Sequence, residues 1–310
     1  MTVPGTWAEP RQDVWFTSGR ERCHAWLYLP AAATSPPPVI VMAHGLGAVK
    51  TLRLDAFAER FVAAGYAALV FDYRYFGDSE GNPRELISIR RQRQDWRAAV
   101  AFARKLRDVD SSRVVLWGTS FGGGHAIATS AGTPDIAATV VQCPFTDGFA
   151  SVRAIPARAV ARLLVAGLRD QLSAVLRRPP VRIKGAARPG ETGLMSNSED
   201  VARVLALLDA AGLSESDYRN DVPARAALTI PVARPGGRTR KIRGPILFCV
   251  CEHDRVAPAG ATLRHAARAP RGEIRTYPAG HFDIYTGPLF EQVAGDQLAF
   301  LQRHVPVEQR

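Results

Sequence analysis

The sequence lacks the features that mark membrane and secreted proteins. It contains no continuous apolar run of about 18 residues, the minimum for a transmembrane helix, so no membrane association is expected. Residues 1–5 show no basic segment followed by an apolar one, which argues against a secretory leader and predicts a cytoplasmic protein. Only 4 of the 310 residues are cysteines, in agreement with a reducing compartment.

Motifs for metals and cofactors are missing as well. Cys249 and Cys251 form a C-x-C pair, but no matching second pair accompanies them, so we interpret them as small buried hydrophobic residues. The glycine-rich stretch 118–124 is not followed by Gly-Lys-Ser/Thr, which excludes a phosphate loop. We therefore expect neither a cofactor nor a metal ion.

Acidic residues are scarce relative to basic ones. The chain has 29 Asp and Glu against 40 Lys and Arg, a formal net charge of +11. Residues 151–243 hold 17 of the basic and 8 of the acidic residues, so the rest of the chain, with 23 and 21, is close to neutral. No tight run of about five basic residues occurs, and no aromatic–basic interleaving, so nucleic-acid binding is not expected.

Hydrophobic residues make up 46% of the chain, enough for a substantial core, and apolar runs alternate with helical patterns. Two stretches around residues 14–17 and 23–29 predict a hairpin. Strand–helix alternation after them predicts a mostly parallel sheet with helices on both faces. Buried strands are expected at 38–43, 67–71, 114–117, 136–142, 245–250 and 273–277, and helices at 51–64, 85–107, 121–131, 259–269 and 288–303.

The alternation breaks between residues 150 and 240. Residues 150–178 have helical spacing, 179–193 read as irregular, and a further helix is expected after Ser198. This pattern predicts an α/β core in two parts, residues 1–149 and 241–310, split by a helical lid over 150–240. Its first helix carries an apolar stripe that predicts either packing within the molecule or a homodimer contact, namely Val160, Leu163, Leu164, Leu168, Leu172 and Leu176.

The strongest chemical signal is the pentapeptide Gly-Thr-Ser-Phe-Gly at residues 118–122. It follows an apolar strand and opens a helix, which is the context of a nucleophile elbow. Small residues on either side allow the backbone to turn sharply, so the Ser120 hydroxyl is expected at the carboxyl edge of the sheet, where ligands bind in α/β folds.

A serine hydroxyl needs a neighbouring base to become a nucleophile. Of seven histidines, His281 is favoured because it follows the last predicted strand, after a glycine that permits a loop at the same sheet edge. His125 lies one turn beyond Ser120, on a helix expected to point away.

Two aspartates compete for the role of the acid that orients the histidine. Asp254 follows the strand predicted at 245–250, which gives the chain order Ser, Asp, His. Asp147 follows the preceding strand at 136–142 and is the alternative. We favour Asp254 because its loop should emerge beside that of His281.

A tetrahedral intermediate requires two hydrogen-bond donors. The backbone N–H of Phe121, at the start of a helix, is one candidate. The second is the N–H of Leu46, in the His-Gly-Leu-Gly loop 44–47 that follows the first parallel strand. His44 is expected to hold that loop.

These segments, with residues 71–79, 251–258 and 280–283, together resemble the α/β-hydrolase superfamily. Within it the chain is similar to the dienelactone hydrolase-like and X-Pro dipeptidyl peptidase-like branches, including fungal polyketide transferase-like hydrolases. The resemblance covers about 36–150 and 243–303 and implies the α/β-hydrolase fold. Dienelactone hydrolases have cysteine as nucleophile where this chain has Ser120, which favours ordinary ester or lactone chemistry.

The sequence therefore predicts a serine hydrolase that cleaves a small-molecule carboxylic ester or lactone through an acyl-Ser120 intermediate. His281 would act as base and then acid, with Asp254 orienting it. The alternatives are an acyltransferase or carbon–carbon bond hydrolase on the same triad, and a non-catalytic receptor with a relic triad.

Overall fold

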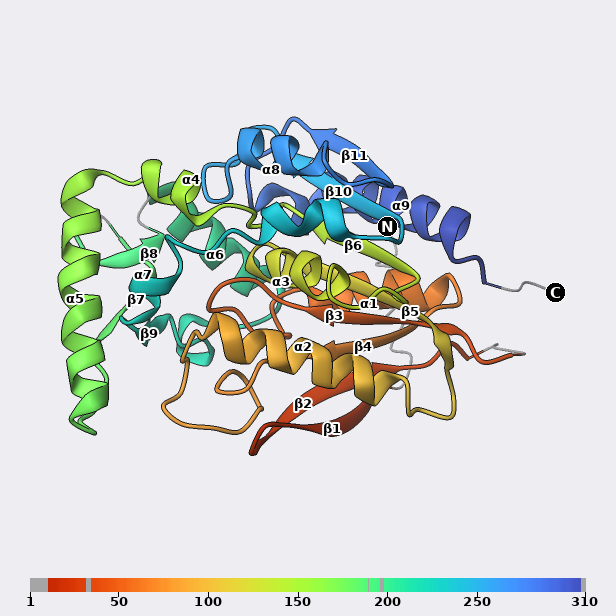
Figure 1. Ribbon diagram of the computed structural model, residues 1–310, viewed down its shortest axis with the longest axis horizontal. Helices are drawn as coiled ribbons and strands as arrows, with labels where there is room; N and C mark the ends of the chain where they lie inside the picture. The colour runs from red at the N-terminus through yellow and green to blue at the C-terminus, as the bar shows by residue number, and fades with distance from the viewer. Residues whose placement is uncertain (1–10, 32–34, 189, 196–197, 308–310) are drawn as a thin grey trace.

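The computed structural model describes residues 11–31, 35–188, 190–195 and 198–307. Its centre is an eight-stranded sheet in the order β1-β2-β4-β3-β5-β6-β10-β11 (Figure 1). The six strands β4, β3, β5, β6, β10 and β11 are parallel to one another, and β2 is antiparallel to both of its neighbours, β1 and β4. The strands are β1 (Gln12–Ser18), β2 (Glu21–Tyr28), β3 (Pro38–Ala43), β4 (Ala67–Phe71), β5 (Asp110–Thr119), β6 (Ala138–Gln142), β10 (Ile246–Cys251) and β11 (Gly272–Tyr277).

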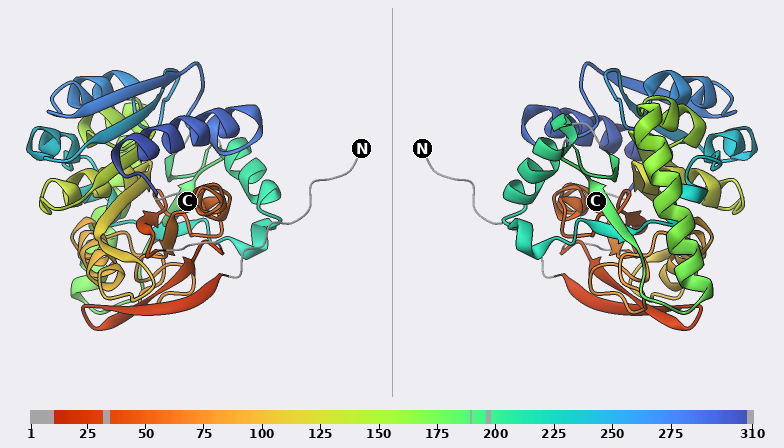
Figure 2. Two further views of the ribbon diagram at one scale, coloured as in Figure 1. Left: turned by 90° about the vertical axis from the view of Figure 1, so that its right-hand side faces the viewer. Right: turned by 90° about the vertical axis from the view of Figure 1, so that its left-hand side faces the viewer.

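Helices cover both faces of this sheet, as Figures 1 and 2 show. The helices α1 (Leu54–Ala63) and α9 (Gly287–His304) pack on one face, and α2 (Ile89–Ala103), α3 (Phe121–Ser130) and α8 (Ala259–Ala266) pack on the other. The central strands β3 and β4 are therefore buried on both sides, which explains their uninterrupted apolar runs. The predicted α/β-hydrolase architecture is confirmed.

The segment between β6 and β10 adds no strand to the main sheet within the described residues, and its helix α5 lies beyond the ends of the strands (Figure 1). A three-stranded sheet in the order β8-β7-β9 stands among its helices. Its elements are α4 (Gly148–Arg153), α5 (Ala157–Val175), β7 (Arg182–Ala186), β8 (Gly193–Met195), α6 (Ser198–Ala210), η1 (Glu215–Asp217), β9 (Asp221–Pro223), α7 (Ala226–Thr229) and η2 (Pro235–Lys241).

Three sequence-based expectations were wrong in detail. The helix predicted over 85–107 is only α2, because Glu85 takes a positive φ of 60° that a helix cannot contain. The helical stretch 150–178 is divided at Pro156, which precedes α5. Residues 179–193, predicted as irregular, contain β7, which pairs with the short β8 and with β9. Because β9 is distant in sequence, that pairing gives no local signal.

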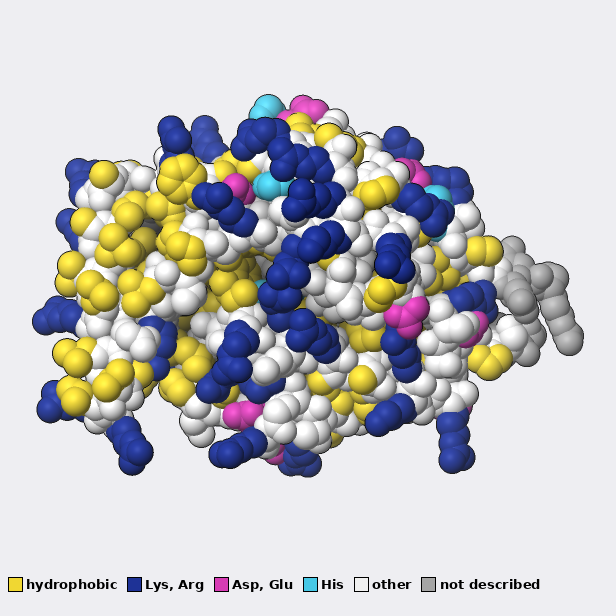
Figure 3. Space-filling model, in the orientation of Figure 1, with side chains coloured by type: hydrophobic (Ala, Val, Ile, Leu, Met, Phe, Trp, Pro, Cys, Tyr) yellow, Lys and Arg dark blue, Asp and Glu magenta, His cyan; other side chains and the backbone are white. Residues whose placement is uncertain are grey.

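The apolar stripe of α5 is largely exposed. Leu163 is buried, whereas Leu164, Leu168, Leu172 and Leu176 are exposed, and Figure 3 shows hydrophobic side chains gathered over this end of the molecule. No helix in the described ranges is long and apolar enough to cross a bilayer.

A buried ion pair connects α2 to the segment that follows β4. The guanidinium of Arg74, just after β4, donates from Nε to Oδ1 of Asp95 on α2 at 2.7 Å and also to the Ser18 hydroxyl at the end of β1. Both partners of the pair are almost fully buried. Removing one partner of such a pair leaves an uncompensated charge in the interior.

We predict that Arg74→Met lowers the free energy of unfolding by about 3–5 kcal/mol, because Asp95 loses its countercharge. Urea denaturation measures this. The control is Arg303→Met, which breaks a half-exposed pair with Glu273 and should cost less than about 1 kcal/mol. The double variant Arg74→Met/Asp95→Leu should regain much of the loss. Equal losses for Arg74→Met and Arg303→Met would refute the argument.

Candidate active site

The turn between β5 and α3 places Ser120 in a strained conformation. Its φ of 52° and ψ of −119° lie where side chains are rarely tolerated. The turn can be this sharp because Gly118 and Gly122 have no Cβ, which allows neighbouring backbone segments to approach closely. A Cβ on Gly118 would lie 2.4 Å from the carbonyl oxygen of Gly122, and a Cβ on Gly122 would lie 2.4 Å from that of His44. The geometry is that of a nucleophile elbow.

Ser120, His281 and Asp254 lie in one hydrogen-bonded chain. His281 Nε2 is 3.0 Å from Ser120 Oγ, and His281 Nδ1 donates to Asp254 Oδ2 at 2.7 Å. Backbone N–H groups of Val256 and Ala257 donate to the other carboxylate oxygen, Oδ1, which fixes the plane of the acid. The structure therefore brings together the three residues that the sequence singled out, from the ends of β5, β10 and β11.

The charge on Asp254 acts directly on the imidazole. Burial is the largest single effect and disfavours the protonated ring, but the Asp254 carboxylate and the Cys143 sulfur together outweigh it and raise the pKa of His281 well above its ordinary value. A histidine in this setting holds a proton readily after it has accepted one.

Asp147, the alternative acid, has a structural role. Its Oδ1 accepts hydrogen bonds from the N–H groups of Phe149 and Ala150, at 2.9 and 3.2 Å, and so caps the N-terminus of α4. Its carboxylate also lies 3.8 Å from His265 Nε2. The contacts of Asp147 are thus with the start of α4 and with His265 on α8, not with His281.

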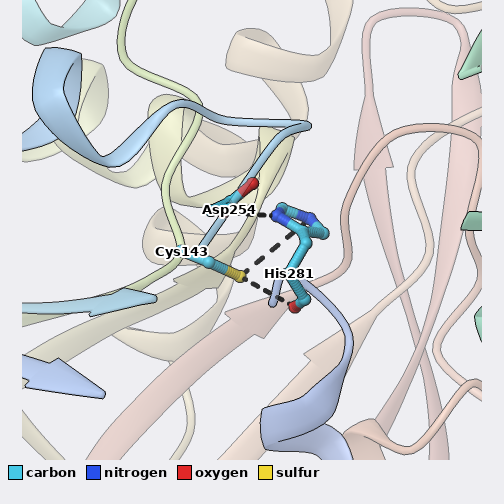
Figure 4. Close-up of side chains that lie close together, drawn as sticks. All are labelled: Cys143, Asp254 and His281. Carbon is cyan, nitrogen blue, oxygen red and sulfur yellow. Dashed lines mark hydrogen bonds and ion pairs between the residues drawn. The ribbon is translucent and has the colours of Figure 1, made fainter. Parts of the chain in front are cut away.

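Cys143 was not singled out from the sequence, yet it lies against the same histidine. Its thiol donates to the carbonyl oxygen of His281 at 3.7 Å, and its sulfur is 4.0 Å from His281 Nε2. Figure 4 shows Cys143 and Asp254 beside the ring. The residue directly follows β6 and has a φ of 34°. Its contact with His281 joins residues 138 positions apart, so no local pattern in the sequence could reveal it.

The loop that carries Leu46 is anchored by a buried lysine, another feature that the sequence did not reveal. The backbone N–H of Lys50 donates to Asp72 Oδ1 at 2.7 Å, and its Nζ donates to Oδ2 of both Asp72 and Asp78 at 2.6 Å. His44, expected to hold this loop, contributes through Nδ1, which lies 3.0 Å from the carbonyl oxygen of Gly45. Its pKa falls to about 4 because it is buried, so the ring is neutral.

An apolar cavity of about 80 Å³ opens over Ser120. Leu46 and Phe121 line it together with Ser120, so both residues predicted to supply oxyanion donors lie beside the hydroxyl. Elements of the segment between β6 and β10 form the opposite wall. Among the described residues, no acidic or basic side chain lines this cavity; its wall from that segment consists of Ser151, Val152, Ile155, Val160, Leu163, Leu164, Leu194, Met195, Ala227, Ile230 and Pro231.

Comparison with known proteins agrees with this geometry. A family model described as serine aminopeptidase, S33, matches residues 34–286, most of the chain. The chain belongs to this family of α/β hydrolases. It is therefore a hydrolase, and the family's fold is the one described above.

Individual proteins are similar to this chain over most of its length. Quorum-quenching protein AidA of Acinetobacter baumannii is 50% identical over 296 residues, which cover 96% of each protein. Polyketide transferase ATR5 of Stachybotrys chlorohalonatus is 27% identical and covers 94% of this chain and 97% of its own. The crystal structure of the α/β hydrolase GrgF from Penicillium sp. sh18 superposes with a TM-score of 0.81 at 24% identity, over 95% of this chain and 99% of that one.

Among the residues that the structure describes, two groups of side chains have the residue types of a metal site. Cys143, Asp254 and His281 form one, but both ring nitrogens of the histidine are already engaged, by Asp254 and Ser120. His24, Asp72 and Asp78 form the other, but the Lys50 ammonium lies between the two carboxylates. Neither group suits a cation, because the ring of His281 is already engaged on both sides and the Lys50 ammonium already neutralises the Asp72 and Asp78 carboxylates.

The elbow gives a prediction about stability. Gly122→Ala should lower the free energy of unfolding by about 1–3 kcal/mol or more, because its Cβ would clash with the carbonyl oxygens of both His44 and Ala43. Thermal and urea denaturation measure the loss. Gly132→Ala, two residues beyond α3, is the matched control, since its Cβ would meet nothing closer than 3.6 Å and should change stability little. A tolerated Gly122→Ala would contradict the close approach.

Proposed function

We propose that this hydrolase cleaves a carboxylic ester or lactone through an acyl-Ser120 intermediate. The observation that carries the proposal is the hydrogen-bonded chain from Asp254 through His281 to Ser120, which ends at the floor of an apolar cavity. A serine in such a chain loses its proton to the imidazole as it attacks a carbonyl carbon.

Each residue has one role in the proposed reaction. His281 accepts the Ser120 proton and passes it to the leaving alkoxide. In the second half-reaction it takes a proton from water, whose oxygen attacks the acyl group, and returns that proton to Ser120 Oγ as the acyl–oxygen bond breaks and the carboxylic acid leaves. Asp254 keeps Nδ1 protonated, so that Nε2 faces the hydroxyl, and stabilises the imidazolium that forms. No metal or cofactor enters the scheme.

The tetrahedral intermediate would be stabilised by the backbone N–H groups of Phe121 and Leu46. Phe121 is the first residue of α3, so its N–H has no acceptor within the helix. Leu46 lies across the same cavity, on the loop held by the Lys50–Asp72 contacts. Donors of this kind act without reorganising during the reaction, which makes them effective.

The cavity favours a substrate with an apolar acyl group. Its lining is aliphatic and aromatic apart from Ser120 and Ser151. A family description that names an aminopeptidase does not fit this lining, because a free amino group would require a carboxylate and none lines the cavity in the described chain. The name of AidA, a quorum-quenching protein, supports a small-molecule substrate such as a lactone.

An acyltransferase on the same triad is the second candidate. It is favoured by the relative named polyketide transferase ATR5 and by the apolar lining of the cavity, which would slow hydrolysis of the acyl-enzyme by excluding water. Product analysis with water or an alcohol as the acceptor separates the two reactions.

We propose that residues 150–240 act as a lid over the pocket, supported by the residues that they contribute to its wall. A homodimer through the exposed face of α5 stays a prediction, as do the cytoplasmic location and the absence of membrane and nucleic-acid partners.

Ser120→Ala should lower turnover on the order of 10⁶-fold while the protein stays folded. The substrates are nitrophenyl esters of rising acyl length and a set of lactones. Mass spectrometry of a trapped acyl-enzyme, or labelling by a fluorophosphonate, should locate the adduct on Ser120. A variant that keeps more than a few per cent of the wild-type rate, or an adduct elsewhere, would exclude Ser120 as the nucleophile.

Asp254→Asn should cost about 10⁴-fold in rate, because His281 loses the group that orients it. Asp147→Asn is the control and should change stability rather than chemistry, since Asp147 caps α4.

The same pair of variants tests the pH dependence. His281 must be neutral to accept a proton, so the wild-type rate should fall as pH drops through its pKa, which Asp254 raises. In Asp254→Asn this acidic limb should move to lower pH, and in Asp147→Asn it should not move. A limb unchanged in Asp254→Asn, or a larger rate loss in Asp147→Asn, would assign the acid to another residue.

A further inference from the structure

A second cavity, of about 190 Å³, lies on the other side of the Phe121 and Phe145 rings from the catalytic pocket. The centroids of the two rings are 5.0 Å apart, and both residues line both cavities, so the rings form the wall between the two cavities. The rest of this second space is bounded by α2, α3 and η2, and three arginines line it: Arg93, Arg234 and Arg238. We call it the arginine cavity.

Arg93 is the central group of the arginine cavity. It projects from α2, and its Nε is buried with no hydrogen-bond partner among the described residues. A buried donor on a charged group that lacks an acceptor is costly in free energy, so native structures rarely contain one without a ligand or water. The Arg93 Nε–H group is thus available to an acceptor that enters the cavity.

Like charges surround Arg93. Burial lowers the pKa of its guanidinium, and the charges of Arg238 and Arg97 lower it further. Of the arginines that line the cavity, Arg234 alone approaches a carboxylate in the described chain, and its Nε is 3.9 Å from Asp147 Oδ1. Positive charges of this kind repel one another unless an anion lies between them.

The carboxylates nearby are committed elsewhere. Asp95, the acidic residue of α2, is buried against Arg74 at 2.7 Å. The remaining titratable group that lines the cavity is His125, whose pKa falls to about 3 because it is buried, so its ring is neutral and adds no charge of either sign. Its Nε2 lies 3.0 Å from Gln92 Oε1. The excess positive charge is therefore not balanced from within.

We propose that the arginine cavity binds a phosphate group, either free or as the monoester of a small molecule. Guanidinium groups hold phosphate through paired, charge-assisted hydrogen bonds, and a dianion suits several clustered arginines better than a single carboxylate does. The Phe121 and Phe145 rings give an apolar floor against which the carbon portion of a monoester would pack.

The surroundings favour a small ligand over a polymer. Figure 3 shows Lys and Arg side chains in a band across this face, next to a hollow with hydrophobic side chains. A nucleic acid would use the band as a whole, whereas the buried Arg93 Nε lies below the surface, where only a small group can reach it. The proposal does not depend on the hydrolytic reaction, because Ser120 lies on the far side of the aromatic wall.

Calorimetric titration of the full-length protein with inorganic phosphate and with phenyl phosphate tests the site, at an ionic strength held constant with chloride. Wild-type protein should bind saturably. Arg93→Gln and Arg238→Gln should each weaken binding about tenfold or more, the loss expected for a charge-assisted hydrogen bond. Arg158→Gln, on the exposed face of α5, removes the same charge at a distance and should bind as the wild type does.

The two probes distinguish the source of the phosphate. Tighter binding of phenyl phosphate indicates a monoester that uses the aromatic floor, and equal affinities indicate free phosphate. Without phosphate, Arg93→Gln should melt at or above the wild-type temperature, because it relieves repulsion, which a merely structural arginine would not do.

Three results would overturn the proposal. One is a wild-type response to phosphate no greater than to chloride. Another is unchanged affinity in Arg93→Gln and Arg238→Gln. The third is tight binding of a single-stranded RNA that Arg158→Gln weakens as much as Arg93→Gln, which would assign the band to a polyanion instead.

Discussion

The strained turn at Ser120 is the constraint on which the rest of the site depends. A residue at φ 52° is held there only because β5, α3 and the loop after β3 approach within backbone contact, through Gly118 and Gly122. The strain lifts the hydroxyl above the sheet edge, where His281 can reach it from the end of β11. Parallel strands make this possible, because all their carboxyl ends meet at one edge.

Buried charge organises the strand ends around that turn. The segment after β4 supplies Asp72, which receives two hydrogen bonds from Lys50 and so fixes the loop of Leu46, and Arg74, which pairs with Asp95 on α2. Such pairs contribute little net stability, since desolvation offsets their attraction, but they penalise other arrangements strongly. We infer that these ion pairs hold the loop of Leu46 and the segment after β4 in fixed positions near Ser120.

The segment between β6 and β10 gives the two cavities opposite characters. Over Ser120 it contributes aliphatic side chains, whereas on the other side of the Phe121–Phe145 wall it contributes Arg234 and Arg238. The same aromatic pair thus faces an apolar pocket and a basic one. An anion in the arginine cavity would lie against Phe121, whose N–H is proposed to stabilise the oxyanion in the catalytic pocket. Phe121 therefore connects the two cavities.

Local patterns in the sequence determined the α/β-hydrolase fold, the elbow at Ser120 and the loops of Asp254 and His281, because strand–helix alternation and glycine-flanked turns are short-range signals. The sequence favoured Asp254 over Asp147, and the tertiary structure decided between them. Tertiary structure alone decided that Lys50 is buried on Asp72 and that Cys143 lies against His281. It also decided the strand β7 and the grouping of Arg93 with Arg238, which come from elements distant in sequence. Such contacts join residues that lie far apart in the sequence, so the short-range patterns from which helices, strands and turns are predicted do not reveal them.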